Sequence, residues 1–171
     1  MVVADRWEFS QVVRDRAVVW RREAFLMCGD WPLAEDLVQT ALLRLYTRWH
    51  RIDPSGVDAY ARRVISRLAI DEARRPYRRA ELREALPETP VRAAESAMAL
   101  DVRAALQKVP PKQRAVLVLR FFSDLTNAEA AKVLRISEGT VKSQAARGLT
   151  TLRRLLGEPA ETTGQSKGSH R

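Results

Sequence analysis

Arginine is concentrated in one stretch of the sequence, where it could bind phosphate groups. Residues 62–79 contain seven arginines and no lysine against one Asp and one Glu, so their net charge is +5. A guanidinium group binds phosphate through two parallel hydrogen bonds, which suits this stretch to oriented contacts with a nucleic acid. A solvated helix face would have the same composition, and the arginines alone favour that simpler explanation. Tyr60 and Trp49 flank the neighbouring loop, where their rings could stack on unpaired bases or pack in the core.

A second group of basic and polar residues lies in a segment typical of a helix-turn-helix. Two helices are predicted over 127–134 and 138–156, with a three-residue turn between them. This geometry sets a second helix into the major groove of DNA. The candidate DNA-binding residues on the face opposite its apolar stripe are Thr140, Lys142, Ser143 and Arg147. Lys and Arg can donate to guanine, and Ser and Thr can bind phosphate or base. The same spacing also fits a plain helical hairpin with a solvated basic face.

The turn of this motif has one unusual residue. Thr126 or Asn127 is expected to cap the first helix and Ser137 the second, because their side-chain oxygens accept from free backbone N–H groups. Arg135 stands where such turns usually have Gly. A residue other than Gly in a left-handed turn costs about 1 kcal/mol.

Acidic residues gather on a predicted amphipathic helix over 34–49. Leu37, Ala41, Leu45 and Trp49 recur every four residues and predict its buried stripe. Glu35 and Asp36 are expected in its first turn, after Asp30. Together with Gln39 they could simply complement the helix dipole or face a basic groove of another protein.

The remaining pattern is helical almost throughout. Further helices are predicted over 12–27, 58–75, 99–109 and 112–122, with a loop at 52–56 and a stop at Pro76. The sequence thus predicts an all-α fold of two small helical domains, 1–85 and 98–157, each with a modest core. A flexible linker, 86–97, is expected between them and a disordered tail, 158–171, after them.

Composition narrows the classes of protein to consider. The chain has 171 residues, a net charge of +9, one cysteine and two histidines. Cys28 can form no internal disulfide, and the histidines are too far from it to suggest a metal site. No secretory signal or membrane-spanning run is found, so a cytoplasmic protein without membrane contact is expected. The basic excess favours a polyanion or an acidic protein surface as partner.

Three motifs in sequence order resemble those of a known protein family. They are residues 34–39 (AEDLVQ), the group of Tyr60, Ile70-Asp71 and Arg74-Arg75, and residues 137–143 (SEGTVKS). With this spacing, the chain resembles the extracytoplasmic-function (ECF, group 4) sigma factors of bacterial RNA polymerase. The phrases GDW at 29–31, LYTRW at 45–49 and DAYARR at 58–63 look most like the actinobacterial SigE-like subgroup. The resemblance covers about residues 8–156.

The resemblance implies how such a chain would meet the polymerase. The AEDLVQ helix would dock on the clamp helices of the β′ subunit, and the second domain would sit on the β-flap. The polymerase-binding residues so implied are Glu35, Asp36, Leu37, Val38 and Gln39. The linker would run through the RNA channel of the polymerase, which its negative charge fits. No cofactor is implied, and an anti-sigma factor is a further partner that the resemblance allows.

The resemblance also implies two promoter contacts. Residues 52–79 would open and read the −10 element, and residues 98–156 would read the −35 element, with Lys142, Ser143 and Arg147 at the reading positions. The −10 residues so implied are Tyr60, Arg62, Arg63, Arg67, Asp71, Arg74 and Arg75. This sequence departs from the usual pattern at two of them, because Tyr60 replaces the usual Trp and Arg67 a frequent Asn.

Two other functions compete with a sigma factor. A dimeric helix-turn-helix regulator of an operator would explain only the C-terminal half. A sigma mimic that binds an anti-sigma protein and never DNA would be expected to lack Lys142, Arg147 and the arginine run. An enzyme is not expected, since the sequence has no Gly-rich phosphate loop, metal-ligand spacing or set of nucleophile and base.

Overall fold

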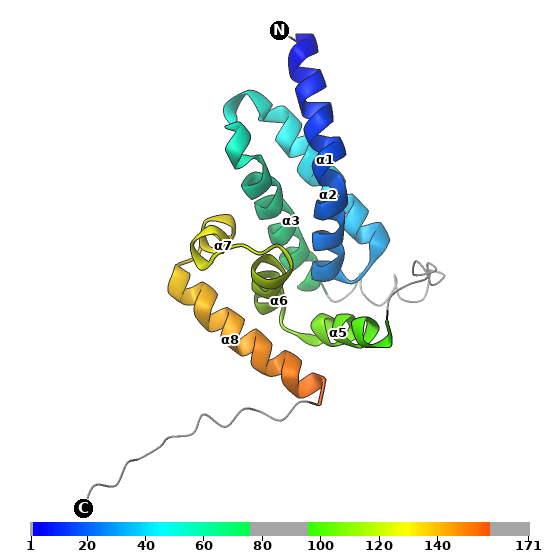
Figure 1. The fold of residues 1–171 in the computed structure, drawn as a ribbon. Helices are drawn as coiled ribbons and strands as arrows, with labels where there is room; N and C mark the ends of the chain where they lie inside the picture. The colour runs from blue at the N-terminus through cyan, green and yellow to red at the C-terminus, as the bar shows by residue number, and fades with distance from the viewer. Residues whose placement is uncertain (1, 76–95, 158–171) are drawn as a thin grey trace, which may run out of the picture.

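Every regular element in the two ranges that the structure describes is helical. The computed structural model describes residues 2–75, called here the first half, and residues 96–157, the second half. The helices are α1 (Val2–Cys28), α2 (Trp31–Thr47), α3 (Val57–Ala73), α5 (Ala97–Lys108), α6 (Pro111–Leu117), α7 (Asn127–Leu134) and α8 (Glu138–Leu155). Short turns η1 (Trp49–Arg51) and η2 (Pro54–Gly56) precede α3, and a π-helical stretch, η3 (Val118–Phe122), follows α6. The all-α prediction is confirmed (Figure 1).

The first half is a bundle of α1, α2 and α3, which contact one another. Gly29, with φ +76°, makes the turn after α1, and the Asp30 carboxylate caps α2 by accepting from the backbone N–H of Leu33 at 2.8 Å. α2 therefore begins at Trp31, three residues before the predicted start. Glu35 and Asp36 lie in its second turn and not, as predicted, in its first. The N-terminal helix also begins earlier than residue 12, because no helix breaker occurs before Gly29.

The second half contains the predicted helix-turn-helix. Thr126 caps α7 in a reciprocal capping box with Glu129, and Ser137 caps α8 by accepting from the N–H of Thr140 at 3.1 Å. Arg135 adopts the left-handed conformation, with φ 55° and ψ 47°, as its place in the turn predicts. The predicted single helix over 112–122 instead widens after Leu117, where Ser123 N–H bonds the carbonyl of Val118, five residues back.

Predictions about the ends of the two domains can be checked only in part. Ser96 caps α5 and Ala97 is its first residue, so the last two residues of the predicted linker belong to a helix start. The rest of that linker, residues 76–85 of the first domain and the predicted tail at 158–171 lie outside the described residues.

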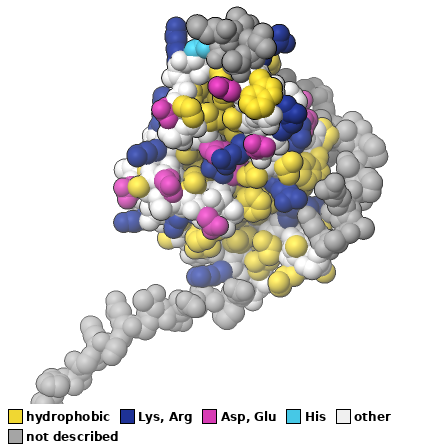
Figure 2. Space-filling view, turned by 45° about the horizontal axis from the view of Figure 1, so that its top comes forward, with side chains coloured by type: hydrophobic (Ala, Val, Ile, Leu, Met, Phe, Trp, Pro, Cys, Tyr) yellow, Lys and Arg dark blue, Asp and Glu magenta, His cyan; other side chains and the backbone are white. Residues whose placement is uncertain are grey.

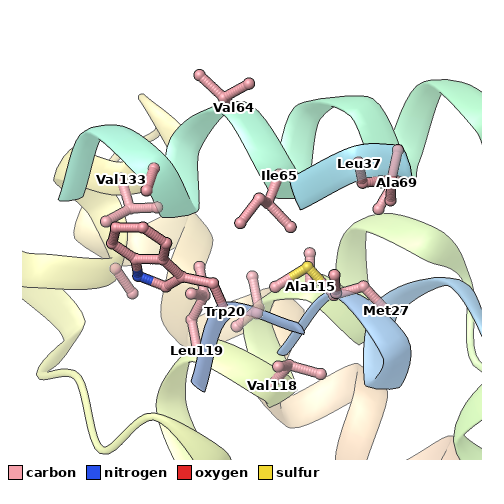
Figure 3. Packing of buried hydrophobic residues seen from close by; sticks show 14 of the residues in the cluster. Trp20, Met27, Leu37, Val64, Ile65, Ala69, Ala115, Val118, Leu119 and Val133 are labelled. Carbon is pink, nitrogen blue, oxygen red and sulfur yellow. The ribbon is translucent and has the colours of Figure 1, made fainter. Parts of the chain in front are cut away.

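The two halves share one hydrophobic core, whereas the sequence analysis expected a core in each. α3 packs against α6 and α7, and α1 packs against α5, α6 and η3. Trp20 of α1 is completely buried, with Ile65 of α3 on one side and Leu119 and Val118 of the second half on the other (Figure 3). α8 rests on α5, α6 and α7 and lies beyond α6 as seen from the three-helix bundle (Figure 1).

Removing the backbone strain at the left-handed residue in the turn should stabilise the protein. Arg135 is exposed, so Arg135→Gly should raise the free energy of unfolding by about 0.5–1 kcal/mol, because Gly adopts this conformation without a clash of Cβ. Ala146→Gly, an exposed site inside α8, should instead lower it by about 1 kcal/mol. Urea unfolding followed by circular dichroism checks both, and an unchanged or lower midpoint for Arg135→Gly would contradict the strain.

Candidate nucleic-acid interface

The outer face of α8 carries the predicted basic residues in an accessible position. Val141, Ala145 and Gly148 are buried toward α6 and α7, and this leaves Lys142 and Arg147 exposed on the other side. Neither side chain has a hydrogen-bond or ion-pair partner within the part of the chain that the structure describes. A helix held by its apolar stripe, with unpaired cations opposite, is arranged to meet phosphates and base edges.

Two other predicted residues of α8 have local partners. The Thr140 hydroxyl lies 2.8 Å from that of Ser137, and Thr140 is half-buried, so this residue belongs to the N-cap. The exposed Ser143 donates to the carbonyl of Thr140 at 3.0 Å, as serines in helices commonly do. Ser143 keeps two free acceptor lone pairs, whereas Thr140 is oriented by the cap.

The arginines of α3 fall into two groups. Arg67, Asp71, Arg74 and Arg75 are exposed, and within the described residues only Arg75 of these four has an ion pair, with Glu72 at 3.3 Å. Arg62 and Arg63 are turned to other parts of the protein. The arginines predicted to meet the −10 element are therefore not equally accessible.

Arg62 forms a buried ion pair with Glu23 of α1. Its Nε lies 3.0 and 3.1 Å from the two carboxylate oxygens and its Nη2 lies 2.8 Å from Oε1. The Glu23 side chain is 1% exposed and that of Arg62 14%. Burial lowers the pKa of the Arg62 guanidinium, but the hydrogen bonds and charge of Glu23, together with the charges of Asp58 and Glu129, raise it overall. Arg62 is thus charged and cannot contact DNA in this conformation, contrary to the prediction.

Arg63 is also engaged. It donates to the carbonyls of Val133 at 3.4 Å and Lys132 at 3.2 Å, at the C-terminal end of α7. These are among the last carbonyls of a helix, which lack partners within it. The second predicted −10 contact is therefore held by the second half of the chain.

The aromatic residues beside the loop are partly buried. Trp49 meets Phe9 edge to face at 5.3 Å between ring centroids. Tyr60 is half-buried and packs against the core. Tyr60 therefore packs against the core while part of the residue stays accessible. Both explanations that the sequence left open, packing in the core and stacking on an unpaired base, are compatible with this position.

The predicted polymerase-binding motif on α2 has two sides. Asp36 and Gln39 are exposed, and Glu35 is half-buried in an ion pair with Arg21 at 2.9 Å. Leu37 and Val38 are buried in the core, so the prediction that they contact a partner is wrong for this conformation. Their side chains hold α2 on α1 and α3.

The exposed face of α2 also includes apolar residues that the sequence analysis missed. Leu43 is 67% and Tyr46 49% exposed, and both continue the row of Asp36 and Gln39 at spacings of three or four residues. Leu43 lies outside the four-residue repeat of the buried stripe, a signal that could have identified it. Figure 2 shows apolar side chains among single basic and acidic ones on the face in view, without one continuous basic field there.

No helix among residues 2–75 and 96–157 has the length and apolar character needed to span a membrane.

Each half of the chain matches a known protein family. Residues 14–79 match the family Sigma-70 region 2, and residues 99–152 match Sigma-70, region 4. The chain is 38% identical over 155 residues to the RNA polymerase sigma-E factor of Streptomyces coelicolor, covering 87% of this chain and 86% of that protein. It is 32% identical over 160 residues to the ECF RNA polymerase sigma factor SigM of Mycobacterium tuberculosis, covering 91% and 81%.

A solved structure has the same fold. The sigma factor RpoE of Bartonella quintana, in complex with the anti-sigma factor NepR, superposes with a TM-score of 0.71 at 21% identity, covering 88% of this chain and 97% of that one. With both regions present in order and relatives matched over most of their length, this chain belongs to the ECF RNA polymerase sigma factors and is similar to those of the actinobacterial SigE type.

Proposed function

We propose that this chain binds core RNA polymerase and directs it to promoters by recognising a −35 and a −10 element. The observation that carries the proposal is the recognition helix α8 of a sigma family member, whose Lys142 and Arg147 stand exposed and unpaired by the rest of the described chain. Catalysis belongs to the polymerase, and the chain itself is a non-enzymatic initiation factor of the cytoplasm.

For the −35 element, we assign base and phosphate contacts to Lys142, Ser143 and Arg147. They lie in the first three turns of α8, the part of a recognition helix that enters the major groove. Thr140 is assigned to the N-cap of α8, where its hydroxyl and backbone N–H contact Ser137.

For the −10 element, the exposed Arg67, Asp71, Arg74 and Arg75 of α3 are the immediate contacts, with Tyr60 as the stacking residue. Arg62 and Arg63 can join them only after leaving Glu23 and the end of α7. Guanidinium groups can hold the backbone of a separated strand while an aromatic ring holds a base.

For the polymerase, we assign the face of α2 formed by Asp36, Gln39, Leu43 and Tyr46 to the β′ clamp helices. The second half would contact the β-flap. The solved sigma factor RpoE is in complex with the anti-sigma factor NepR, and the solved CnrH is in complex with the cytosolic domain of CnrY. We propose an anti-sigma factor as a further partner of this chain.

Run-off transcription tests the whole proposal. Core polymerase from Streptomyces coelicolor, the organism of a 38% identical relative, is supplied with this chain and a genomic DNA library. Transcripts that start at a shared pair of upstream elements are expected. Footprints by the chain alone, with no new transcripts, would favour an operator-binding regulator. If the chain gives no transcripts and no footprints but binds an anti-sigma protein, the result would favour a sigma mimic.

Charge reversal on α2 should weaken polymerase binding. Asp36→Arg would place a cation against a basic groove and cost several kcal/mol, a loss of roughly 30-fold or more in affinity. Asp101→Arg, the same change at an exposed position of α5, should bind normally. Pull-down of core polymerase measures both, and wild-type binding by a folded Asp36→Arg protein would remove α2 as the contact.

Truncation on α8 should reduce discrimination of the upstream element. Arg147→Ala should lose about 1–3 kcal/mol of preference for an intact over a scrambled −35 element. Lys142→Ala should do the same or, if the residue meets phosphate, weaken all promoters evenly and flatten the salt dependence. Arg154→Ala in the last turn of α8 is the control. An unchanged ratio of transcription for Arg147→Ala would exclude it as a reader.

Tyr60 variants should separate stacking from packing. Tyr60→Phe keeps the ring and should retain transcription, whereas Tyr60→Leu keeps apolar contacts and should lose about 1–3 kcal/mol of base stacking. A template already mismatched across the −10 region should restore most of the activity of Tyr60→Leu. If polymerase binding is normal but the premelted template gives no rescue, Tyr60 does not open DNA.

A further inference from the structure

An aromatic cluster joins the start of α1 to the end of α2, at one end of the three-helix bundle (Figure 1). The ring of Phe9 meets that of Tyr46 with 5.1 Å between centroids and 66° between the ring planes. It also meets the ring of Trp49, the first residue of η1, at 5.3 Å and 85°. Both contacts are edge to face, so the positive edge of one ring lies against the negative face of another. Phe9 is therefore in contact with two rings that are three residues apart in the sequence.

The three rings of this cluster differ in how far they are open to solvent. Phe9 and Trp49 are half-buried and pack against the hydrophobic core. Tyr46 is exposed, and its hydroxyl has no hydrogen-bond partner among the residues that the structure describes. The core therefore holds Phe9 and Trp49, and Phe9 in turn holds Tyr46, the exposed member of the cluster.

The orientation of the Tyr46 ring depends on a contact from outside α2. Tyr46 lies in the last turn of this helix, which ends at Thr47, and the last turns of helices fray more readily than their interiors. The neighbouring Leu45 is completely buried and anchors the backbone. Its side chain nevertheless points about 100° away from that of Tyr46 around the helix axis. Phe9 of α1 supplies the contact that Leu45 cannot make.

Tyr46 belongs to the face of α2 that we assign to the polymerase, together with Asp36, Gln39 and Leu43. Tyrosine is one of the residues that most often dominate the binding energy of protein interfaces, because its ring buries a large area and its hydroxyl can still form a hydrogen bond. A ring that is already held in place before binding loses less conformational freedom when a partner covers it. The contact with Phe9 therefore prepares Tyr46 for such a role.

We propose that Phe9 is a positioning residue for polymerase binding, which holds the Tyr46 ring in the orientation that the outer face of α2 presents to its partner. Trp49 supports this role because it packs against Phe9 as well. The inference rests on the proposed assignment of the α2 face to the polymerase. It makes the first turns of α1 necessary for an interface on α2 to which they contribute no surface of their own.

Fluorine NMR tests the positioning of the ring without the polymerase. The three tyrosines of the chain are replaced by 3-fluorotyrosine, and Tyr46→Phe identifies the signal of Tyr46. In the folded wild-type chain, this signal should be displaced from its position in the urea-unfolded chain by the neighbouring ring. Phe9→Leu keeps an apolar side chain without a ring and should return the signal at least halfway. Phe9→Tyr keeps the ring and should leave the Tyr46 signal displaced.

Affinity for core polymerase from Streptomyces coelicolor tests the role in binding. Phe9→Leu should weaken binding about two- to tenfold, the range expected for the loss of one edge-to-face pair. Tyr46→Ala should weaken it at least tenfold, and adding Phe9→Leu should then change the affinity less than twofold, because Phe9 acts through a ring that is already absent. Phe9→Tyr should bind like the wild type. The matched control is Trp7→Leu, at an exposed position on the opposite side of α1, which should also bind normally.

The double variant separates positioning from a general loss of stability. If Phe9→Leu weakens binding equally in the wild-type and Tyr46→Ala backgrounds, or if the Tyr46 signal does not move, the positioning role is overturned. Normal binding by Tyr46→Ala with weak binding by Asp36→Arg would overturn it too, and would leave the α2 assignment intact. Normal binding by both variants would refute the α2 assignment and, with it, the role of Phe9. If Phe9→Leu does not fold by circular dichroism, Phe9→Met decides, because its flexible side chain fills a similar space without a ring.

Discussion

Glu23 can be buried only because donors reach its carboxylate from two directions. A carboxylate removed from water loses several kcal/mol of solvation, which Arg62 and Ser123 must offset through well-placed hydrogen bonds. Removal of one partner from such a group typically costs about 3–5 kcal/mol. Ser123 reaches it only because η3 packs on α1. The same requirement applies to Arg114, whose guanidinium is satisfied by carbonyls from both halves. These two groups therefore set the register between helices that apolar packing alone would leave loosely specified.

The orientation of α8 depends on this packing indirectly, through α6. α6 lies between the first half and α8, with Ala115, Val118 and Leu119 of α6 and η3 buried in the shared core. On the opposite side, Gly148 lets α8 approach Leu117 so closely that a Cβ would lie 3.0 Å from that side chain. The apolar stripe of α8 is buried in this contact. The basic face on the opposite side of the helix is therefore directed outward. A helix whose position is fixed on one side presents its other side reliably, as DNA reading requires.

Local signals in the sequence predicted much of the fold. Thr126, Ser137 and Arg135 were recognised because caps and turns act over three or four residues. The contacts of Glu23 with Arg62 and Ser123 join residues 39 and 100 positions apart, and no periodicity reveals them. The widening of the helix at η3 was missed for a related reason, since residues 112–122 have an ordinary helical pattern. The predicted start of α2 differs from the observed one because acidic residues favour the first turn of a helix, whereas here Asp30 supplies the cap and Glu35 and Asp36 lie one turn later.

The AEDLVQ motif illustrates why a family resemblance indicates a helix more securely than a surface. Successive residues of an α-helix are about 100° apart, so any five in a row pass completely around its axis. Five consecutive residues, from Glu35 to Gln39, therefore cannot all face a partner. In this fold Leu37 and Val38 take the inner positions and Asp36 and Gln39 the outer ones. The outer row is then completed by residues beyond the motif, Leu43 and Tyr46, one and two turns further on. A partner that binds this helix must recognise residues distributed along α2 and not the contiguous segment by which the sequence reveals it.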